Sequence, residues 1–137
     1  MTPRYDGLAH AHGDLRDVLA AFATALGHPA PPPVGHALHD ALARAARYFG
    51  HELPHHVAEE EAELYPALAR RVRPGALGTL REQHAALLVM APMYDRAYAA
   101  FVEAPSVDAW HGLRHIGARL AAALAAHLDL EDALIKA

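Results

Sequence analysis

Residues 107–136 read VDAWHGLRHIGARLAAALAAHLDLEDALIK, a proline-free stretch in which core-type side chains recur every three or four positions. This is the period of one face of an α-helix. Ser106 is a suitable N-cap and Asp108 would lie in the first turn, so the helix is expected to begin there. The stripe consists of Leu113, Ile116, Leu120, Leu124, His127, Glu131 and Leu134. The stretch therefore predicts a helix that packs against other helices, with two polar residues among its core positions.

Proline and glycine separate this stretch from three more segments of helical period. The breaks are HPAPPPVG at residues 28–35, Arg73-Pro74-Gly75, and the turn around Pro105. Four helices with short connections predict an all-α fold, an up-down-up-down four-helix bundle, in which residues 1–137 form a single domain. The three further segments are residues 5–27, 36–72 and 76–103.

Three prolines, Pro54, Pro66 and Pro92, fall inside the predicted helices. A proline removes a backbone donor, and its ring clashes with the carbonyl four residues earlier. We therefore expect a kink or local break at each of them, and a separate short turn of helix after Pro66.

The composition excludes several classes of function. The 137 residues include no cysteine, which excludes disulfides, thiolate catalysis, iron–sulfur clusters and cysteine-ligated zinc. The net charge of −4 provides no basic surface for nucleic acid, and no apolar run is long enough to predict a membrane span. The N-terminal residues are polar and lack the apolar region of a secretory signal. We therefore expect a cytoplasmic protein that contacts neither nucleic acid nor membrane.

Six polar residues interrupt the apolar stripes of the four segments. The chain has 12 histidines, but about four of them would fall on core stripes by chance, so the count itself says little. More informative is that two of them are followed four residues later by a glutamate on the same helix face. Ionised residues are rare in cores and need a compensating partner. The six residues are His12, His56, Glu60, His84, His127 and Glu131.

The topology of the bundle brings these six residues to one level. In an up-down-up-down bundle, the starts of the first and third helices lie beside the ends of the second and fourth. His12 and His84 come early in their segments, whereas the two His–Glu pairs come late in theirs. All six side chains are therefore predicted to converge at one end of the core, an arrangement that a metal site requires.

The other histidines considered are expected at the surface or the rim of the bundle. They are His10, His28, His36, His51, His55, His111 and His115. Of these, His10 and His55 are the alternatives if the helix register differs by a residue or two.

The donor set restricts the kind of metal. Four imidazoles and two carboxylates are too many ligands for one tetrahedral zinc, and too rich in nitrogen for calcium or magnesium. The set suits two iron or manganese ions bridged by the carboxylates. Each metal would receive two histidine nitrogens and one oxygen from each glutamate, with at least one position open for a small molecule. The competing hypothesis is a metal-free bundle whose core histidines are satisfied by other side chains.

The motifs around these residues resemble the hemerythrin-like (HHE) domain family. The most specific part is ELPHHVAEEEAELYPAL at residues 52–68, with His12-x-x-Leu-Arg before it and Glu-Gln-His84-x-x-Leu and His127-x-x-x-Glu after it. The resemblance spans nearly the whole chain and implies a four-helix bundle that holds a non-heme di-iron centre. By position, it implies the same six ligands.

Two comparisons within that resemblance bear on function. Oxygen-carrying members have an additional histidine four residues from another on the third helix, whereas His84 has Leu80 and Leu88 at these positions. The chain therefore resembles the six-ligand branch, which puts reversible oxygen carriage in doubt. Oxygen carriers also have a His-x-x-x-x-Asp spacing in the last helix, which leaves Asp132 as an alternative to Glu131.

The resemblance implies a protein that binds or senses oxygen or nitric oxide at two iron ions. The alternative is a di-iron oxidoreductase that consumes peroxide or nitric oxide, or an iron-handling or stress protein. No glycine-rich phosphate loop for a flavin or nicotinamide is present, so a dedicated enzyme ranks lower. Tyr94 and Tyr98 lie on the same stripe as His84, and we expect them to pack as rings with a hydroxyl partner rather than to act in redox chemistry.

Overall fold

The computed structural model describes residues 3–33 and 35–136, and the side chains among them from residue 11 onward. The regular elements of these residues are all helical, with no strand among them. They are α1 (Pro3–Leu26), α2 (Ala37–Arg47), the π-helical turn η1 (Tyr48–Glu52), α3 (Leu53–Glu59), the π-helical turn η2 (Glu60–Leu64), α4 (Tyr65–Leu68), α5 (Pro74–Glu103) and α6 (Val107–Lys136).

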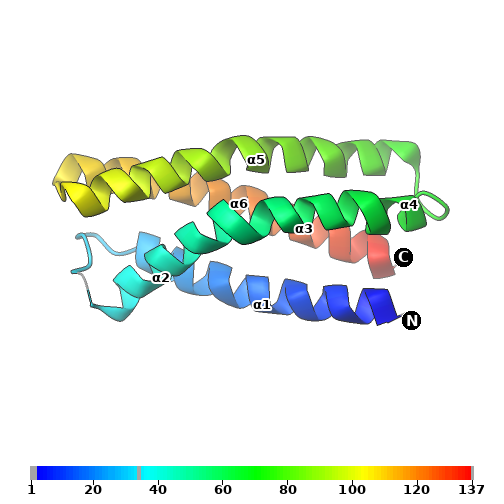
Figure 1. Ribbon diagram of the computed structural model, residues 1–137, viewed down its shortest axis with the longest axis horizontal. Coiled ribbons are helices and arrows are strands. Elements are labelled where there is room, and N and C mark those ends of the chain that lie inside the picture. The colour runs from blue at the N-terminus through cyan, green and yellow to red at the C-terminus, as the bar shows by residue number, and fades with distance from the viewer. Residues whose placement is uncertain (1–2, 34, 137) are drawn as a thin grey trace.

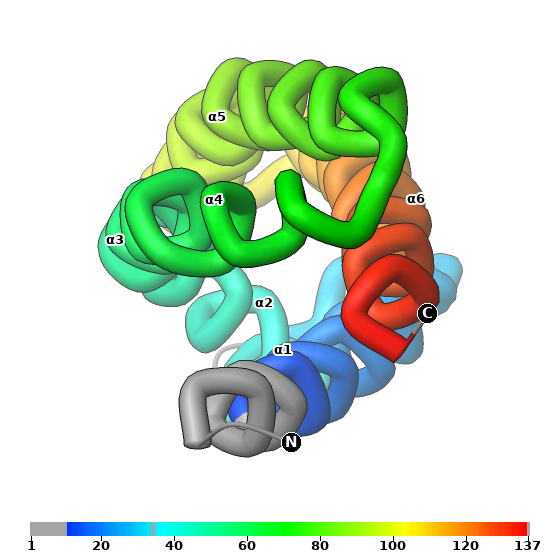
Figure 2. The backbone as a smooth tube through the Cα atoms, turned by 90° about the vertical axis from the view of Figure 1, so that its right-hand side faces the viewer, coloured from blue at the N-terminus to red at the C-terminus, as the bar shows by residue number. Residues whose placement is uncertain are grey.

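Helical rods surround one axis, as the end-on view in Figure 2 shows. The four rods are α1, the segment from α2 to α4, α5 and α6. The second rod is composite, because α2, η1, α3, η2 and α4 follow one another without a loop. Successive rods run in opposite directions, so the start of α1 and the end of α6 lie at the same end of the molecule (Figure 1). The predicted all-α, up-down-up-down four-helix bundle is confirmed. Within the described residues, no helix combines the length and hydropathy needed to cross a bilayer.

Each π turn lies just before a proline. In η1, the N–H of Leu53 donates to the carbonyl of Tyr48, five residues back, and Pro54 follows. In a straight α-helix, the ring of Pro54 would clash with the carbonyl of Gly50, and the wider π turn is a common way to accommodate such a residue. The second π turn precedes Pro66 in the same way. The expected local break therefore takes the form of a π turn at both prolines.

No local break occurs at Pro92, where α5 continues as an α-helix. Pro92 is exposed, and so is Leu88, whose carbonyl would otherwise have received a hydrogen bond from residue 92. Water can satisfy a carbonyl on this face, so the helix need not change its hydrogen bonding.

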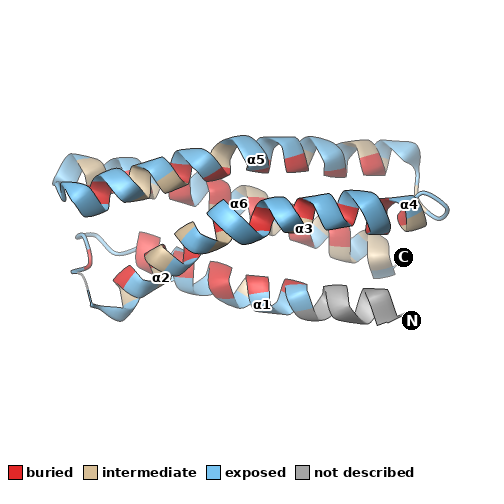
Figure 3. Ribbon diagram, viewed as in Figure 1, coloured by how far each residue is buried: buried red, intermediate tan, exposed pale blue. Residues whose placement is uncertain are grey.

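The core consists of two hydrophobic clusters. The larger one includes Phe22, Phe49 and Tyr94, whose rings meet edge to face at centroid distances of 5.1, 5.5 and 5.7 Å. The smaller one includes Leu64 and Leu80 and lies where α4 meets the start of α5. Along each helix, the residues coloured as buried in Figure 3 recur at intervals and alternate with exposed ones.

The polar core residues lie between the two clusters. Along α5, His84 follows Leu80 of the smaller cluster and precedes Leu87 of the larger one. Along the second rod, Glu60 lies between Val57 of the larger cluster and Leu64 of the smaller one. Apolar side chains therefore enclose this polar layer from both ends of the bundle.

Candidate metal centre

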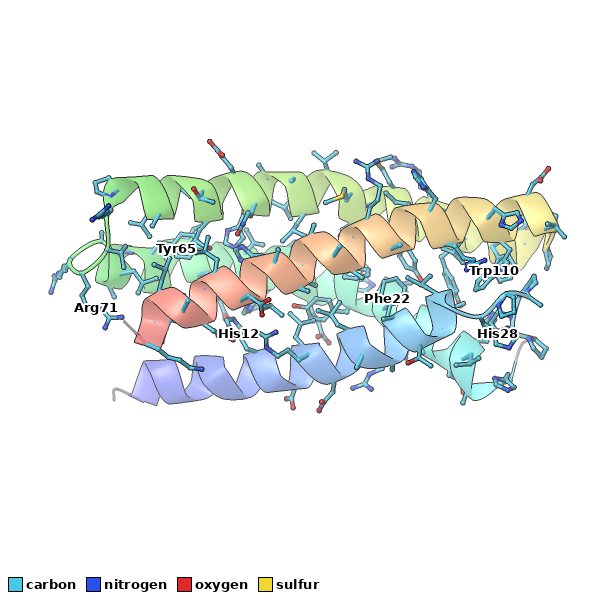
Figure 4. The ribbon with its side chains drawn as sticks, turned by 180° about the vertical axis from the view of Figure 1, so that it is seen from behind. His12, Phe22, His28, Tyr65, Arg71 and Trp110 are labelled. Atoms are coloured by element: carbon cyan, nitrogen blue, oxygen red, sulfur yellow. The ribbon has the colours of Figure 1, made fainter. Side chains whose placement is uncertain are left out.

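The structure places all six predicted side chains in one cluster. They come from all four rods: His12 from α1, His56 from α3, Glu60 from the first position of η2, His84 from α5, and His127 and Glu131 from α6. Five of the six have at most 2% of their surface exposed, and His56 has 19% of its side chain exposed. Figure 4 shows His12 pointing from α1 into the bundle at this level.

The cluster divides into two groups of four that share both glutamates. One group is His12 and His56 with Glu60 and Glu131, and the other is His84 and His127 with the same two carboxylates. Within each group, one ligand atom from every residue lies within 4.8 Å of the others.

Glu60 divides its two oxygens between the histidine pairs. Its Oε1 lies 2.9 Å from Nε2 of His84 and 3.8 Å from Nε2 of His127. Its Oε2 lies 3.1 Å from Nε2 of His56 and 3.4 Å from Nε2 of His12. The carboxylate thus spans the two pairs.

Glu131 divides its oxygens in the same way from the opposite side of the bundle. Its Oε1 lies 2.9 Å from Nε2 of His12, and its Oε2 lies 3.1 Å from Nε2 of His127. All four imidazoles therefore direct Nε2 toward a space between the two carboxylates.

Several polar atoms of this space lack a well-directed hydrogen bond. Within the described residues, these include Nε2 of His56, Nε2 of His127 and Oε1 of Glu131, which are fully buried. Each of them lies 2.9 to 3.1 Å from an imidazole or carboxylate atom of the cluster, but without the direction of a hydrogen bond. Two cations between the carboxylates, one beside His56 and one beside His127, would satisfy all three atoms, so the donor set fits a metal site.

Three of the four imidazoles have a polar partner at Nδ1, on the side away from the carboxylates. Nδ1 of His12 lies 2.7 Å from Asp132, and Nδ1 of His84 lies 3.1 Å from Glu61. Nδ1 of His127 lies 2.8 Å from the side-chain oxygen of Gln83. Histidines that bind metals usually donate their second N–H to such a group, which fixes the tautomer that presents Nε2 to the metal. Sequence reasoning did not identify Glu61 or Gln83, because the partners lie on other helices.

Asp132, the alternative to Glu131, faces away from the shared space. It receives hydrogen bonds from His12 and from Arg16, whose guanidinium lies 2.7 Å from its second oxygen. The two groups of four possible metal ligands contain Glu131 and not Asp132.

Tyr65 is a buried member of the site that the sequence analysis missed. Its hydroxyl donates to Oε2 of Glu131 at 2.9 Å and also lies 2.9 Å from Nε2 of His84. Tyr94, which lies on the same helical stripe as His84, packs in the aromatic cluster and donates to the carbonyl of Leu42 at 3.0 Å. It therefore packs as a ring with a hydroxyl partner, as expected. Tyr98 is half-buried and stacks on Tyr94.

Burial and mutual attraction act in opposite directions on the ionisable groups. Burial lowers the pKa of His12, but Glu131, Glu60 and Asp132 outweigh it and raise that pKa to about 10. The pKa of His127 is likewise raised to about 9, because Glu131 and Glu60 outweigh burial. Burial raises the pKa of Glu60, but the four imidazoles outweigh it and hold that pKa far below its usual range. The buried charge of Glu60 therefore draws positive charge into the cluster.

The other histidines lie outside the cluster. His55, one of the two substitutes, is 75% exposed and pairs with Glu59 at 2.7 Å. The side chain of His10 lies outside the described residues. The remaining predicted surface histidines are exposed. His39, which was not considered, is buried at 7% exposure with its ring 6.0 Å from that of Tyr98.

A sequence model of the Hemerythrin HHE cation binding domain matches residues 4–135. The chain belongs to this family. No curated protein and no solved structure matches it. Membership agrees with the buried His/Glu cluster, which occupies the core of this HHE domain.

A cavity of about 790 Å³ reaches the cluster of this HHE domain at His56. It lies between α1 and the second rod, and its lining includes Ala11 and Leu15 on one side and Tyr48 and His51 on the other. His56 belongs to both the cavity wall and the cluster. The other five cluster residues do not line this cavity.

Proposed function

We propose that this HHE domain is a non-heme di-iron protein that binds or senses a small diatomic ligand, oxygen or nitric oxide. The metal ligands are the six clustered side chains, His12, His56, Glu60, His84, His127 and Glu131. The observation that carries the proposal is the way both glutamates divide their oxygens between the two histidine pairs.

The distances between donor atoms support two metal positions. Ligand atoms on neighbouring corners of an octahedron are about 3.0 Å apart when each is about 2.1 Å from the metal. The shortest contacts of the cluster are 2.9 to 3.1 Å, between imidazole Nε2 and carboxylate oxygen. Each metal position would thus be held by two imidazole nitrogens and two carboxylate oxygens, with further coordination positions left for other ligands.

The donor types support iron. Imidazole and carboxylate without thiolate suit iron or manganese, and carboxylate bridges between helices are common in di-iron bundle proteins. When bound, an iron pair supplies open coordination positions and one-electron redox chemistry. Apolar clusters enclose these positions from both ends of the bundle, and the cavity beside His56 gives access from the solvent side.

Metal content tests the site. Protein from iron-supplemented cells is expected to contain about two irons per chain, a number that follows from the two groups of ligands. Glu60→Gln and Glu131→Gln together should remove most of the iron, because each glutamate serves both positions. Glu59→Gln is the matched control, since Glu59 is adjacent in sequence but exposed and paired with His55. Folded wild-type protein that binds no iron would contradict the proposal.

Rapid mixing separates binding from turnover. Reduced, iron-loaded protein is mixed with oxygen, nitric oxide or peroxide in the presence and absence of a reductant. A stable adduct without continued consumption supports binding or sensing. Continued consumption with the reductant would instead identify an oxidoreductase and contradict a purely binding role.

A further inference from the structure

Tyr65 introduces an asymmetry between the two proposed metal positions. Its hydroxyl lies 2.9 Å from two atoms of the same group, Nε2 of His84 and Oε2 of Glu131. The group formed by His12 and His56 has no comparable hydroxyl among the described contacts. Tyr65 is fully buried, and Figure 4 places it on the second rod near the polar layer.

We propose that Tyr65 is a direct ligand of the metal held by His84 and His127, an inference that rests on the proposed metal centre. A separation of about 3.0 Å from two other ligand atoms is what a neighbouring corner of the same octahedron requires. The phenol oxygen meets this condition for both atoms. On coordination the O–H bond breaks, the oxygen binds the metal, and the proton passes to solvent.

The backbone explains how Tyr65 comes to face the site. In an α-helix the residue five positions after Glu60 would turn away from it, since neighbours on one face are three or four apart. In η2 the N–H of Tyr65 donates to the carbonyl of Glu60, so this turn is wider than an α-helical turn and accommodates one additional residue. The π turn therefore brings Tyr65 to the same side as Glu60.

Neighbouring groups hold the ring in place. The imidazole of His84 stacks on it with centroids 5.2 Å apart and planes 15° from parallel. The guanidinium of Arg81 lies over the ring, 5.8 Å from its centroid, within the range of a cation–π contact.

The consequence is that the two positions differ in their free corners. The position of His84 and His127 has five protein ligands with Tyr65, whereas the position of His12 and His56 has four. An exogenous small molecule is therefore directed to the metal beside His56, where the cavity reaches the cluster.

Resonance Raman spectroscopy of the ferric, iron-loaded protein tests this assignment. Iron-bound tyrosinate gives enhanced ring vibrations and a visible charge-transfer band. Both are expected in the wild type, and the vibrations should shift when the protein is made with ring-deuterated tyrosine. Tyr65→Phe should lose the band, while Tyr94→Phe should keep it, because Tyr94 is buried outside the cluster and bonded to Leu42.

The outcomes distinguish this inference from the metal site itself. Wild-type protein with iron bound but without tyrosine-derived vibrations would overturn the role of Tyr65 and leave the iron site standing. Absence of iron would overturn the site as a whole. If Tyr65→Phe does not fold, the isotope shift in the wild type, with Tyr94→Phe as the comparison, decides the question.

Discussion

Oδ1 of Asp132 lies 2.7 Å from Nδ1 of His12, on the side of the imidazole that faces away from the shared carboxylates. Arg16 holds the second oxygen of Asp132 at 2.7 Å, so the carboxylate has a fixed orientation behind the ring. This contact joins the last helix to the first at the level of the site.

Asp132→Asn is therefore expected to weaken iron binding about 10- to 100-fold, the usual cost of losing a group that orients a metal-binding histidine. A competition titration with a chelator measures the affinity. Asp129→Asn is the control, because Asp129 also pairs with Arg16 but is 72% exposed and makes no contact with His12. Equal losses in the two variants would show that the effect comes from Arg16 and not from His12.

The cavity beside His56 should control ligand entry. Ala11→Trp places a large ring in this cavity and is expected to slow nitric oxide association by about tenfold. The iron content should not change, because Ala11 is exposed and lies outside the core. Ala20→Trp is the matched control, because this exposed alanine of the same helix lines a separate groove of about 650 Å³ between α1 and α6. Stopped-flow absorbance gives both rates. Unchanged association in Ala11→Trp would exclude this route.

The metal-free protein should lose stability as pH rises. His12 and His127 have pKa values raised to about 10 and about 9, above the unfolded value of about 6.5. Their stabilising contribution is therefore complete below pH 6.5 and is lost as pH rises through the folded values. Iron-loaded protein, in which these nitrogens bind metal, should lack this dependence. Urea unfolding of both forms at about pH 6.5, 8 and 9.5 measures the difference. Metal-free protein that becomes more stable over this range would contradict the assignment.

Phe22 supports the fold rather than the cluster. It is fully buried against Phe49 and Tyr94, so Phe22→Ala should lower the free energy of unfolding by about 3–5 kcal/mol. The iron content of the folded fraction should remain that of the wild type, because the rings that Phe22 packs against, Phe49 and Tyr94, do not belong to the six-residue cluster. Denaturant unfolding and metal analysis of the same sample test both halves of this prediction.

Helix positions and the clustered residues followed from local patterns in the sequence. Proline and glycine marked the end of α1, both ends of α5 and the start of α6, and strides of three and four placed His84 and Leu87 on one buried face. The two His–Glu spacings were equally local. These features could be predicted because they depend on periodicity along one helix.

Features that depend on changed register or on tertiary contacts could not be predicted in this way. Tyr65 faces the cluster only because a π turn shifts the helix by one residue, and Pro66 was the available signal for it. Gln83 and Glu61 contact histidines on other helices, at distances set by packing rather than by spacing. Sequence spacing also left Glu131 and Asp132 as alternatives, and only the structure places one inside and the other behind His12.

The central claim is that Glu60 and Glu131 bridge two metal positions, and anomalous diffraction from crystals of the iron-loaded protein at the iron edge tests it most directly. Two peaks are predicted, one beside Nε2 of His12 and His56 and one beside Nε2 of His84 and His127, each bound by one oxygen from each glutamate. A single peak, or two peaks that do not share both carboxylates, would contradict it.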